Sequence, residues 1–275
     1  MARTLAATAR AARTDAWVLA EHGHDAGPDL PGDGWHGTMD YAGFTGPVLT
    51  WLTSGEDLVF GFGRPAAIPS LPAHAVVATM RDVHAEMPWR AQAASTLHLD
   101  SHDIPRFRTL VGGGGSGGVS AAGRARHLVG LALQLTLPGV PALFAGDEIG
   151  LTGVDGEHAR TPFPWGRPES WDAPTLAAYR SWIALRRGSV ALRRGGLRWV
   201  QAGEDSMTFL REHPKQRVLI HLARTDHPPV RLPLAGLGLT SLDELRRLAG
   251  VAVGGTGDVV ELPSCGPAAH AYRLG

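Results

Sequence analysis

The pattern of apolar residues changes near Gly195, and this change constrains the fold more than any other feature of the sequence. Before it, strand-like runs alternate about four times with longer segments of helical periodicity, which is typical of a parallel α/β sheet. After it, short strand-like runs separated by turns follow one another at 197–200, 207–211, 218–222, 230–234, 259–262 and 269–274. We therefore predict an α/β part over residues 1–190 and an antiparallel β-sandwich domain over residues 195–275.

The α/β part has too few strands to close a barrel by itself. Strands are expected to end at Glu21, near Tyr41, at Asp100 and at Ala145, with helices over 1–13, 72–94, 125–137 and 175–187. Four strands cannot close an eight-stranded (β/α)8 barrel, so we predict half of such a barrel. The Gly-rich run 112–118 is interpreted as a surface connection, because no lysine follows it as in a phosphate-binding loop.

Composition excludes several classes of partner. The 275 residues contain 26 basic and 26 acidic side chains, so no net charge draws the chain to nucleic acid or to an anionic membrane. The apolar run Leu128–Ala145 is interrupted by Pro138 and Pro141, so we predict no membrane segment. Cys265 is the only cysteine, which excludes an intrachain disulfide and a thiol-based zinc site and fits a reducing, cytoplasmic location.

Two strand ends carry residues suited to catalysis. The stretch 95–107 begins with alternating leucines and ends in the polar cluster Asp100-Ser101-His102-Asp103. Such a strand end is where an α/β barrel presents catalytic groups, although the same residues could simply cap a turn. Glu21 ends the first strand, where partial loss of solvent would raise its pKa and suit it to donate a proton. The alternative is a strand-end glutamate that faces solvent.

Several segments, taken in order, resemble the α-amylase family (glycoside hydrolase family 13), in particular its α-glucosidase and oligo-1,6-glucosidase members. A strand ending in Glu21 resembles the third signature of the family. Ser101-His102-Asp103 followed by Arg106 resembles the fourth signature, in which an Asn usually stands at the position of Ser101. Residues 34–41, 138–150 and 160–165 resemble the sixth-strand segment, the eighth-strand signature and an Arg-Thr-Pro-x-x-Trp loop. The match covers about 20–165 and corresponds to the C-terminal part of the family's fold.

The resemblance implies a role for each matching residue in retaining glycoside hydrolysis. Glu21 would be the general acid/base and Asp103 the transition-state stabiliser. The residues expected to bind substrate are His22, His102, Arg106 and Trp165. For Trp165, stacking on a sugar and packing within its own loop are both open; Arg106 is expected to orient a nearby carboxylate.

The catalytic nucleophile of the family has no counterpart here. That Asp lies in a Gly-x-Arg-x-Asp segment upstream of the glutamate strand, and no such segment occurs in this sequence. We therefore expect a truncated α-glucosidase that hydrolyses maltose or maltodextrins only in association with a missing N-terminal half. A transglycosylase or sugar isomerase of the same family, and a non-catalytic carbohydrate-binding remnant, are the alternatives. Bond specificity stays open between α-1,4 and α-1,6.

No cofactor and no catalytic metal are expected. His22, His24 and His36 with Asp25 match no metal-ligand spacing of known geometry. A structural Ca²⁺ on a loop such as Asp155–Glu157 has no further support in the sequence. The remaining tryptophans are interpreted as packing residues, namely Trp35, Trp51, Trp89, Trp171, Trp182 and Trp199.

Overall fold

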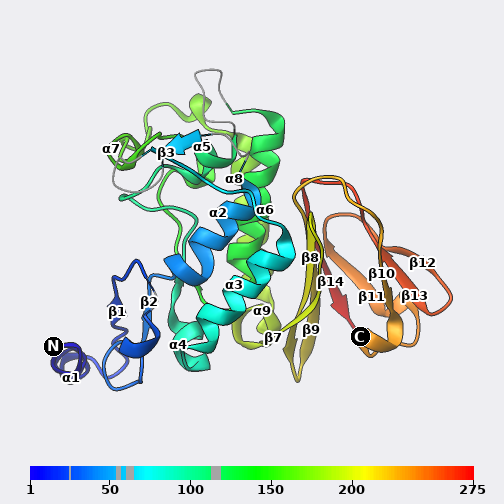
Figure 1. Ribbon diagram of the computed structural model, residues 1–275, viewed down its shortest axis with the longest axis horizontal. Coiled ribbons are helices and arrows are strands. Elements are labelled where there is room, and N and C mark those ends of the chain that lie inside the picture. The colour runs from blue at the N-terminus through cyan, green and yellow to red at the C-terminus, as the bar shows by residue number, and fades with distance from the viewer. Residues whose placement is uncertain (25, 54–56, 60–64, 113–118) are drawn as a thin grey trace.

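The computed structural model describes residues 1–24, 26–53, 57–59, 65–112 and 119–275 (Figure 1). Most of the Gly-rich run 112–118, and Asp25, lie outside the described residues. Helices gather in one part of the molecule, and the strands of the C-terminal part form a separate body beside them.

Four short strands form a parallel arc. They are β1 (Leu19–Ala20), β2 (Gly37–Thr38), β5 (Thr96–Leu97) and β6 (Val140–Pro141). β1 pairs in parallel with β2, and β5 pairs in parallel with β6. A parallel bridge between Met39 and Thr96 joins the two pairs. The order β1-β2-β5-β6 follows the chain, as expected for consecutive strands of a (β/α)8 barrel.

Helices occupy most of the chain between and after these strands. α1 (Ala2–Ala12) precedes β1. Between β2 and β5 lie a π-helical turn (Tyr41–Thr45), α2 (Gly46–Leu52), the hairpin β3 (Asp57–Val59) and β4 (Pro65–Ala67), α3 (Ala73–Ala85) and α4 (Trp89–Ala94). Between β5 and β6 lie α5 (Phe107–Gly112) and α6 (Ala121–Thr136). After β6 come two 3-10 turns (Asp147–Ile149 and Pro168–Ser170), α7 (Gly156–Ala159), α8 (Ala173–Gly188) and α9 (Val190–Arg194).

The predicted helix over 72–94 is two helices rather than one. Pro88 has no N–H to continue the hydrogen-bond ladder of α3, and it has an extended conformation as the residue that precedes α4. The start of α8 follows the usual capping chemistry, because the Asp172 carboxylate accepts a hydrogen bond from Thr175 N.

Two antiparallel sheets form the C-terminal part. The first has the order β11 (Leu245–Ala249), β14 (Ala268–Leu274), β9 (Gln216–Ala223), β8 (Ser206–His213), β7 (Gly196–Ala202). The second has the order β10 (Val230–Pro233), β13 (Val259–Leu262), β12 (Gly254–Thr256). Two 3-10 turns, Leu234–Leu237 and Leu242–Glu244, lie between β10 and β11. Strands β11 and β12 are additions to the sequence prediction.

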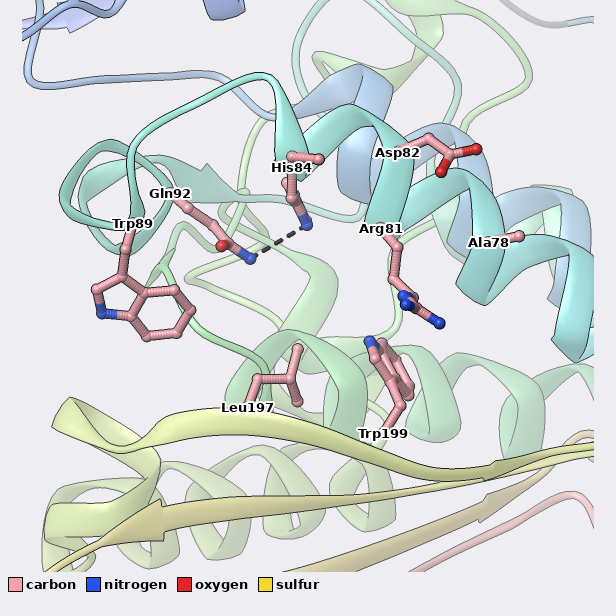
Figure 2. Close-up of a pocket in the computed structure, with 9 residues that line it drawn as sticks. Ala78, Arg81, Asp82, His84, Trp89, Gln92, Leu197 and Trp199 are labelled. Atoms are coloured by element: carbon pink, nitrogen blue, oxygen red, sulfur yellow. Dashed lines mark hydrogen bonds between the residues drawn. The ribbon is translucent and has the colours of Figure 1, made fainter.

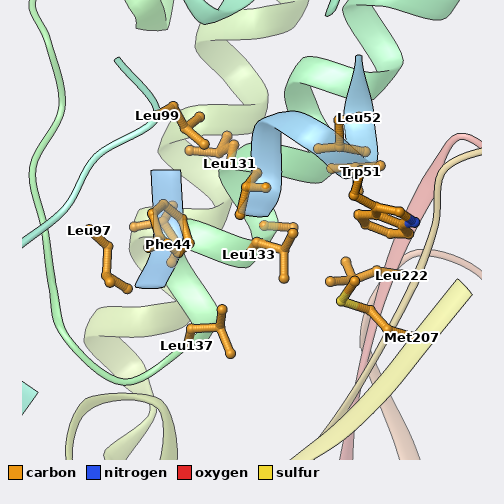
Figure 3. Packing of buried hydrophobic residues seen from close by; sticks show 14 of the residues in the cluster. Phe44, Trp51, Leu52, Leu97, Leu99, Leu131, Leu133, Leu137, Met207 and Leu222 are labelled. Atoms are coloured by element: carbon orange, nitrogen blue, oxygen red, sulfur yellow. The ribbon is translucent and has the colours of Figure 1, made fainter. Parts of the chain in front are cut away.

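Strands β8 and β9 of the first sheet are buried on both faces. Alternate side chains point to opposite faces of a strand, so Met207 and Phe209 of β8 face the helices while Leu210 faces the second sheet. Figure 3 shows Met207 and Leu222 packed beside Trp51 of α2. One hydrophobic core therefore runs from the helices into the β sheet, and a second lies between the two sheets. The division of the chain into 1–190 and 195–275 stays a prediction.

Among the described residues, no helix combines the length and the apolar character that crossing a membrane would require.

Candidate active site

Polar side chains follow each strand of the parallel arc. Glu21 follows β1, Tyr41 follows β2, Asp100 and Asp103 follow β5, and Asp147 follows β6. Because the strands are parallel and adjacent, these residues lie at one edge of the sheet. The structure therefore places Glu21 and Asp103 at the edge where the sequence predicts a site.

Tyr41 is the residue that links these strand ends. Its hydroxyl forms a 2.8 Å hydrogen bond with the Ser101 hydroxyl, and the same Ser101 oxygen accepts from Asp103 N at 3.1 Å. Burial raises the pKa of Tyr41, and the negative charges of Asp103 and Glu21 raise it further. The phenol therefore stays protonated between the two predicted catalytic carboxylates.

Asp103 is held by groups from the loop after β6. Arg160, which follows α7, donates from Nε to His102 O at 2.9 Å and places a guanidinium nitrogen 3.6 Å from Asp103 Oδ1. His102 Nε2 lies 3.3 Å from the same oxygen. A Cβ at Gly156 would lie 2.9 Å from Asp103 O, so the absence of a side chain lets α7 approach this strand end closely. Asp103 remains accessible, with 28% of its side chain exposed.

Arg106 is buried and is not accessible to a substrate. This corrects the prediction that Arg106 binds substrate. Its side chain is 1% exposed and donates to Asp147 Oδ1 at 2.8 Å and to the carbonyl groups of Ala145 and Ala159. Its guanidinium also lies 3.8 Å from the centre of the Phe144 ring. The sequence predicts that Arg106 orients a nearby carboxylate, and the carboxylate that it contacts is that of Asp147. Arg106 is therefore a positioning residue.

Asp100 completes this buried network. Its Oδ2 accepts from Phe107 N at 2.7 Å, whereas its Oδ1 is buried without a donor. Burial raises the pKa of Asp100 well above its ordinary value, and the negative charge of the neighbouring Asp147 carboxyl raises it further. Arg106 favours ionisation of Asp147. We therefore assign the proton of the pair to Asp100.

The remaining predicted residues are distributed around the edge. Glu21 is exposed, so the expected loss of solvent around it is wrong; it lies just beyond the buried end of β1. The His22 ring is partly buried and lies 3.7 Å from Asp29, within its own loop. Trp165 is 75% exposed and packs on Phe163, with 4.2 Å between ring centres. One face of this aromatic pair is thus available to a ligand.

A metal-binding cluster is not found in the part of the chain that the structure describes: no three His, Cys, Asp or Glu side chains are grouped to hold an ion.

Sequence reasoning misses Tyr41 and Arg160 as members of the site, whereas it includes Asp100 in the polar cluster at the strand end. Tyr41 ends a predicted strand in the same way as Glu21, so its position relative to that strand is a signal that could have found it. Arg160 belongs to a recognised loop motif, but its distance from Asp103 depends on how that loop folds back.

The comparisons with known proteins identify relatives over most of the chain. The family model "Alpha amylase, catalytic domain" matches residues 65–189, a range that includes Asp103 and Trp165 but not Glu21. Neopullulanase 2 of Thermoactinomyces vulgaris is 29% identical over 71% of this chain and 29% of its own length. A cyclomaltodextrinase of Geobacillus thermopakistaniensis is 28% identical over 88% of this chain and 38% of its own length. The chain thus spans less than two-fifths of these relatives.

Solved structures show the same fold. A debranching enzyme of Nostoc punctiforme superposes with a TM-score of 0.80 at 23% identity, covering 98% of this chain and 53% of that one. A cyclic α-maltosyl-(1→6)-maltose hydrolase of Arthrobacter globiformis has a TM-score of 0.75 at 25% identity and 52% coverage of that chain. These barrel enzymes confirm the predicted fold class, part of a (β/α)8 barrel followed by an antiparallel β domain. In sequence and in fold the chain is thus similar to enzymes of the α-amylase family, glycoside hydrolase family 13.

Proposed function

We propose that this chain carries the acid/base and the transition-state-stabilising carboxylate of a retaining α-glucan hydrolase. The observation that supports this most is the strand edge, where the Tyr41 phenol is bonded to Ser101 and is influenced by the charges of both Glu21 and Asp103. Retaining glycosidases require a general acid/base and a carboxylate nucleophile, and Glu21 is proposed for the first of these roles. The similarity to enzymes of the α-amylase family supports the same proposal.

In this proposal each carboxylate has a separate task. Glu21 gives a proton to the leaving oxygen and then takes a proton from the attacking water. Asp103 accepts hydrogen bonds from sugar hydroxyls and stabilises positive charge on the ring. His102 and Arg160 fix the position of Asp103. His22 stays a proposed neighbour of the sugar.

The proposed substrates are linear or cyclic maltodextrins. Relatives named cyclomaltodextrinase and neopullulanase support this class. Sugars present apolar C–H faces that pack on aromatic rings, and the Phe163–Trp165 pair offers an exposed ring of this kind. We therefore propose Trp165 as a subsite residue at the edge that carries Asp103.

We further propose that the chain alone completes no turnover. The 275 residues contain no Gly-x-Arg-x-Asp segment, so no counterpart of the family's nucleophile is present. Without a nucleophile the covalent route is closed. The proposed nucleophile is a carboxylate supplied from outside these 275 residues. Cys265 is free and exposed, which agrees with the proposed reducing, cytoplasmic setting.

Calorimetric titration with maltoheptaose tests the binding half of the proposal. Asp103→Asn and Trp165→Ala should each weaken one binding site by about tenfold or more, the loss expected for a charged hydrogen bond or a stacking ring. Asp258→Asn is the matched control, because it makes the same change at an exposed aspartate of the C-terminal β part. Equal affinity in all four proteins would refute the site.

Release of p-nitrophenol from an α-glucoside tests the catalytic half. Neither the 275-residue protein nor its Glu21→Gln variant should show turnover. Turnover that disappears with Glu21→Gln would mean that a carboxylate within this chain is the nucleophile, and the proposed need for a carboxylate from outside it would be wrong.

A further inference from the structure

A groove separates the helices from the first β sheet, away from the strand edge described above. Its volume is about 630 Å³, within the range of small-ligand sites. Figure 2 shows that its lining comes from α3 and α4 on one side and from β7 on the other. The lining combines aromatic, charged and amide side chains, whereas the candidate catalytic residues contribute none of it.

Two indole rings form opposite walls of the groove. Trp89, the first residue of α4, is 47% exposed although the sequence interpretation makes it a packing residue. Trp199 extends from β7, and its ring packs edge to face with that of Phe209, with 5.2 Å between ring centres. Figure 2 shows Trp89 at one end of the groove and Trp199 at the other. The groove is therefore wide enough to present two separate aromatic surfaces.

A fixed hydrogen-bond chain forms the inner wall. His84 Nε2 lies 2.8 Å from Asp40 Oδ2, and Gln92 Nε2 lies 3.1 Å from His84 Nδ1. A neutral histidine satisfies both contacts when it donates to Asp40 and accepts from Gln92. This chain fixes the Gln92 amide in the wall of the groove, where Gln92 is only 7% exposed.

The charges at the mouth of the groove cancel. Arg81 and Asp82 are exposed on α3, and both line the groove. Because the charges of Arg81 and Asp82 are opposite, the groove has no preference for a charged ligand. Both side chains can form hydrogen bonds with hydroxyl groups. Aromatic walls, a fixed amide and balanced charges together fit a neutral polyhydroxylated ligand with apolar ring faces.

We propose that this groove is a second α-glucan-binding site, separate from the strand edge that carries Asp103. Trp89 and Trp199 stack on glucose rings, and Arg81, Asp82 and Gln92 bind their hydroxyls. The sugar class rests on the proposed function, whereas the location rests on the groove itself. Such a site would hold a long glucan on the surface while another part of it reaches the strand edge.

Calorimetric titration of the full chain with maltoheptaose tests the site. The wild type should bind two equivalents, and Trp89→Ala should weaken one of them at least tenfold. Trp89→Phe should keep most of the affinity, because a smaller aromatic ring remains. Arg81→Ala changes an exposed helix residue, and it should weaken the same equivalent. Two equivalents that are unchanged in both Trp89→Ala and Arg81→Ala would overturn the proposal.

The failures of the two proposals are distinguishable. Loss of all binding in Asp103→Asn, with no effect of Trp89→Ala, would keep the proposed function and overturn the second site. Loss in Trp89→Ala with no effect of Asp103→Asn would do the reverse. Equally tight binding of cellohexaose at the groove would overturn the assignment to α-glucans, since that sugar is β-linked.

Discussion

Asp100 and Asp147 are two buried carboxyl groups that share one cation, the Arg106 guanidinium. Two adjacent carboxylates and one arginine would leave a net negative charge in the interior, which is costly. A proton on Asp100 removes that charge. At the residue scale, the strand end that carries Asp103 is thus supported by a protonated acid.

Replacing Asp100 with Asn tests this assignment through the pH dependence of stability. The amide keeps an acceptor for Phe107 N and a donor toward Asp147. In the wild type, the pKa of Asp100 in the folded state lies above its ordinary value of 3.8. The contribution of Asp100 to the free energy of unfolding is therefore complete below pH 3.8 and is lost as the pH rises through the folded-state pKa. Above pH 4, the unfolding free energy of Asp100→Asn should therefore rise relative to that of the wild type by up to about 1.4 kcal/mol per pH unit.

Urea unfolding at pH 4.5, 5.5, 6.5 and 7.5 measures this difference, and the buried histidines cancel because both proteins contain them. Asp147→Asn is the contrast, since it removes the carboxylate that accepts the hydrogen bond from Arg106. It should cost about 3–5 kcal/mol throughout this range. A difference between Asp100→Asn and wild type that stays constant with pH would show that Asp100 is ionised in the folded protein.

The sequence predicts the strand-end positions of Glu21 and Asp103, but not the contacts around them. Tyr41 and Ser101 are 60 residues apart, and their hydrogen bond depends on the pairing of β2 with β5. The burial of Arg106 depends equally on the loop after β6, which covers it. Residue type and local spacing carry no information about such distant partners.

At the element scale, agreement is best where periodicity is strong. The strands β7, β8, β9, β10, β13 and β14 match predicted runs, while β11 and β12 are missed. β11 contains two adjacent exposed arginines, and all of β12 is exposed, so neither has an apolar alternation to detect. The parallel strands are short, since the strand predicted to end at Glu21 forms a ladder only at Leu19–Ala20.

Close packing of these short strands predicts a strong effect of a single methyl group. A Cβ at Gly37 in β2 would lie 2.5 Å from the backbone carbon of Ala94. Gly37→Ala should therefore lower the unfolding free energy by about 1–3 kcal/mol. Gly188→Ala is the control, because a Cβ at the end of α8 meets no atom within 4 Å. Equal thermal midpoints for the two variants would contradict the close approach of β2 and α4.

At the scale of the whole molecule, the continuous core joins the helices to the β domain. Arg211 of β8 strengthens this junction, since its buried guanidinium donates to carbonyl groups of Thr136 and Gly195. Removal from solvent lowers the pKa of Arg211 to about 9, so the cation depends on these carbonyls. The helical part and the β domain should therefore unfold together, although the pattern of apolar residues in the sequence changes between them.

Met207→Ala tests this coupling, because Met207 lies on β8 but packs beside Trp51 of α2 (Figure 3). The cavity should cost about 2–5 kcal/mol, and Met207→Leu, which nearly keeps the volume, less than about 1.5 kcal/mol. Hydrogen exchange measures where the loss falls. With one shared core, amides of α6 and of β9 should lose protection to the same extent in Met207→Ala. Loss of protection confined to the β strands would instead mean that the helices form a separately stable unit. The contacts around Arg211 and Trp51 would then contribute little to the stability of the helical part that carries the candidate site.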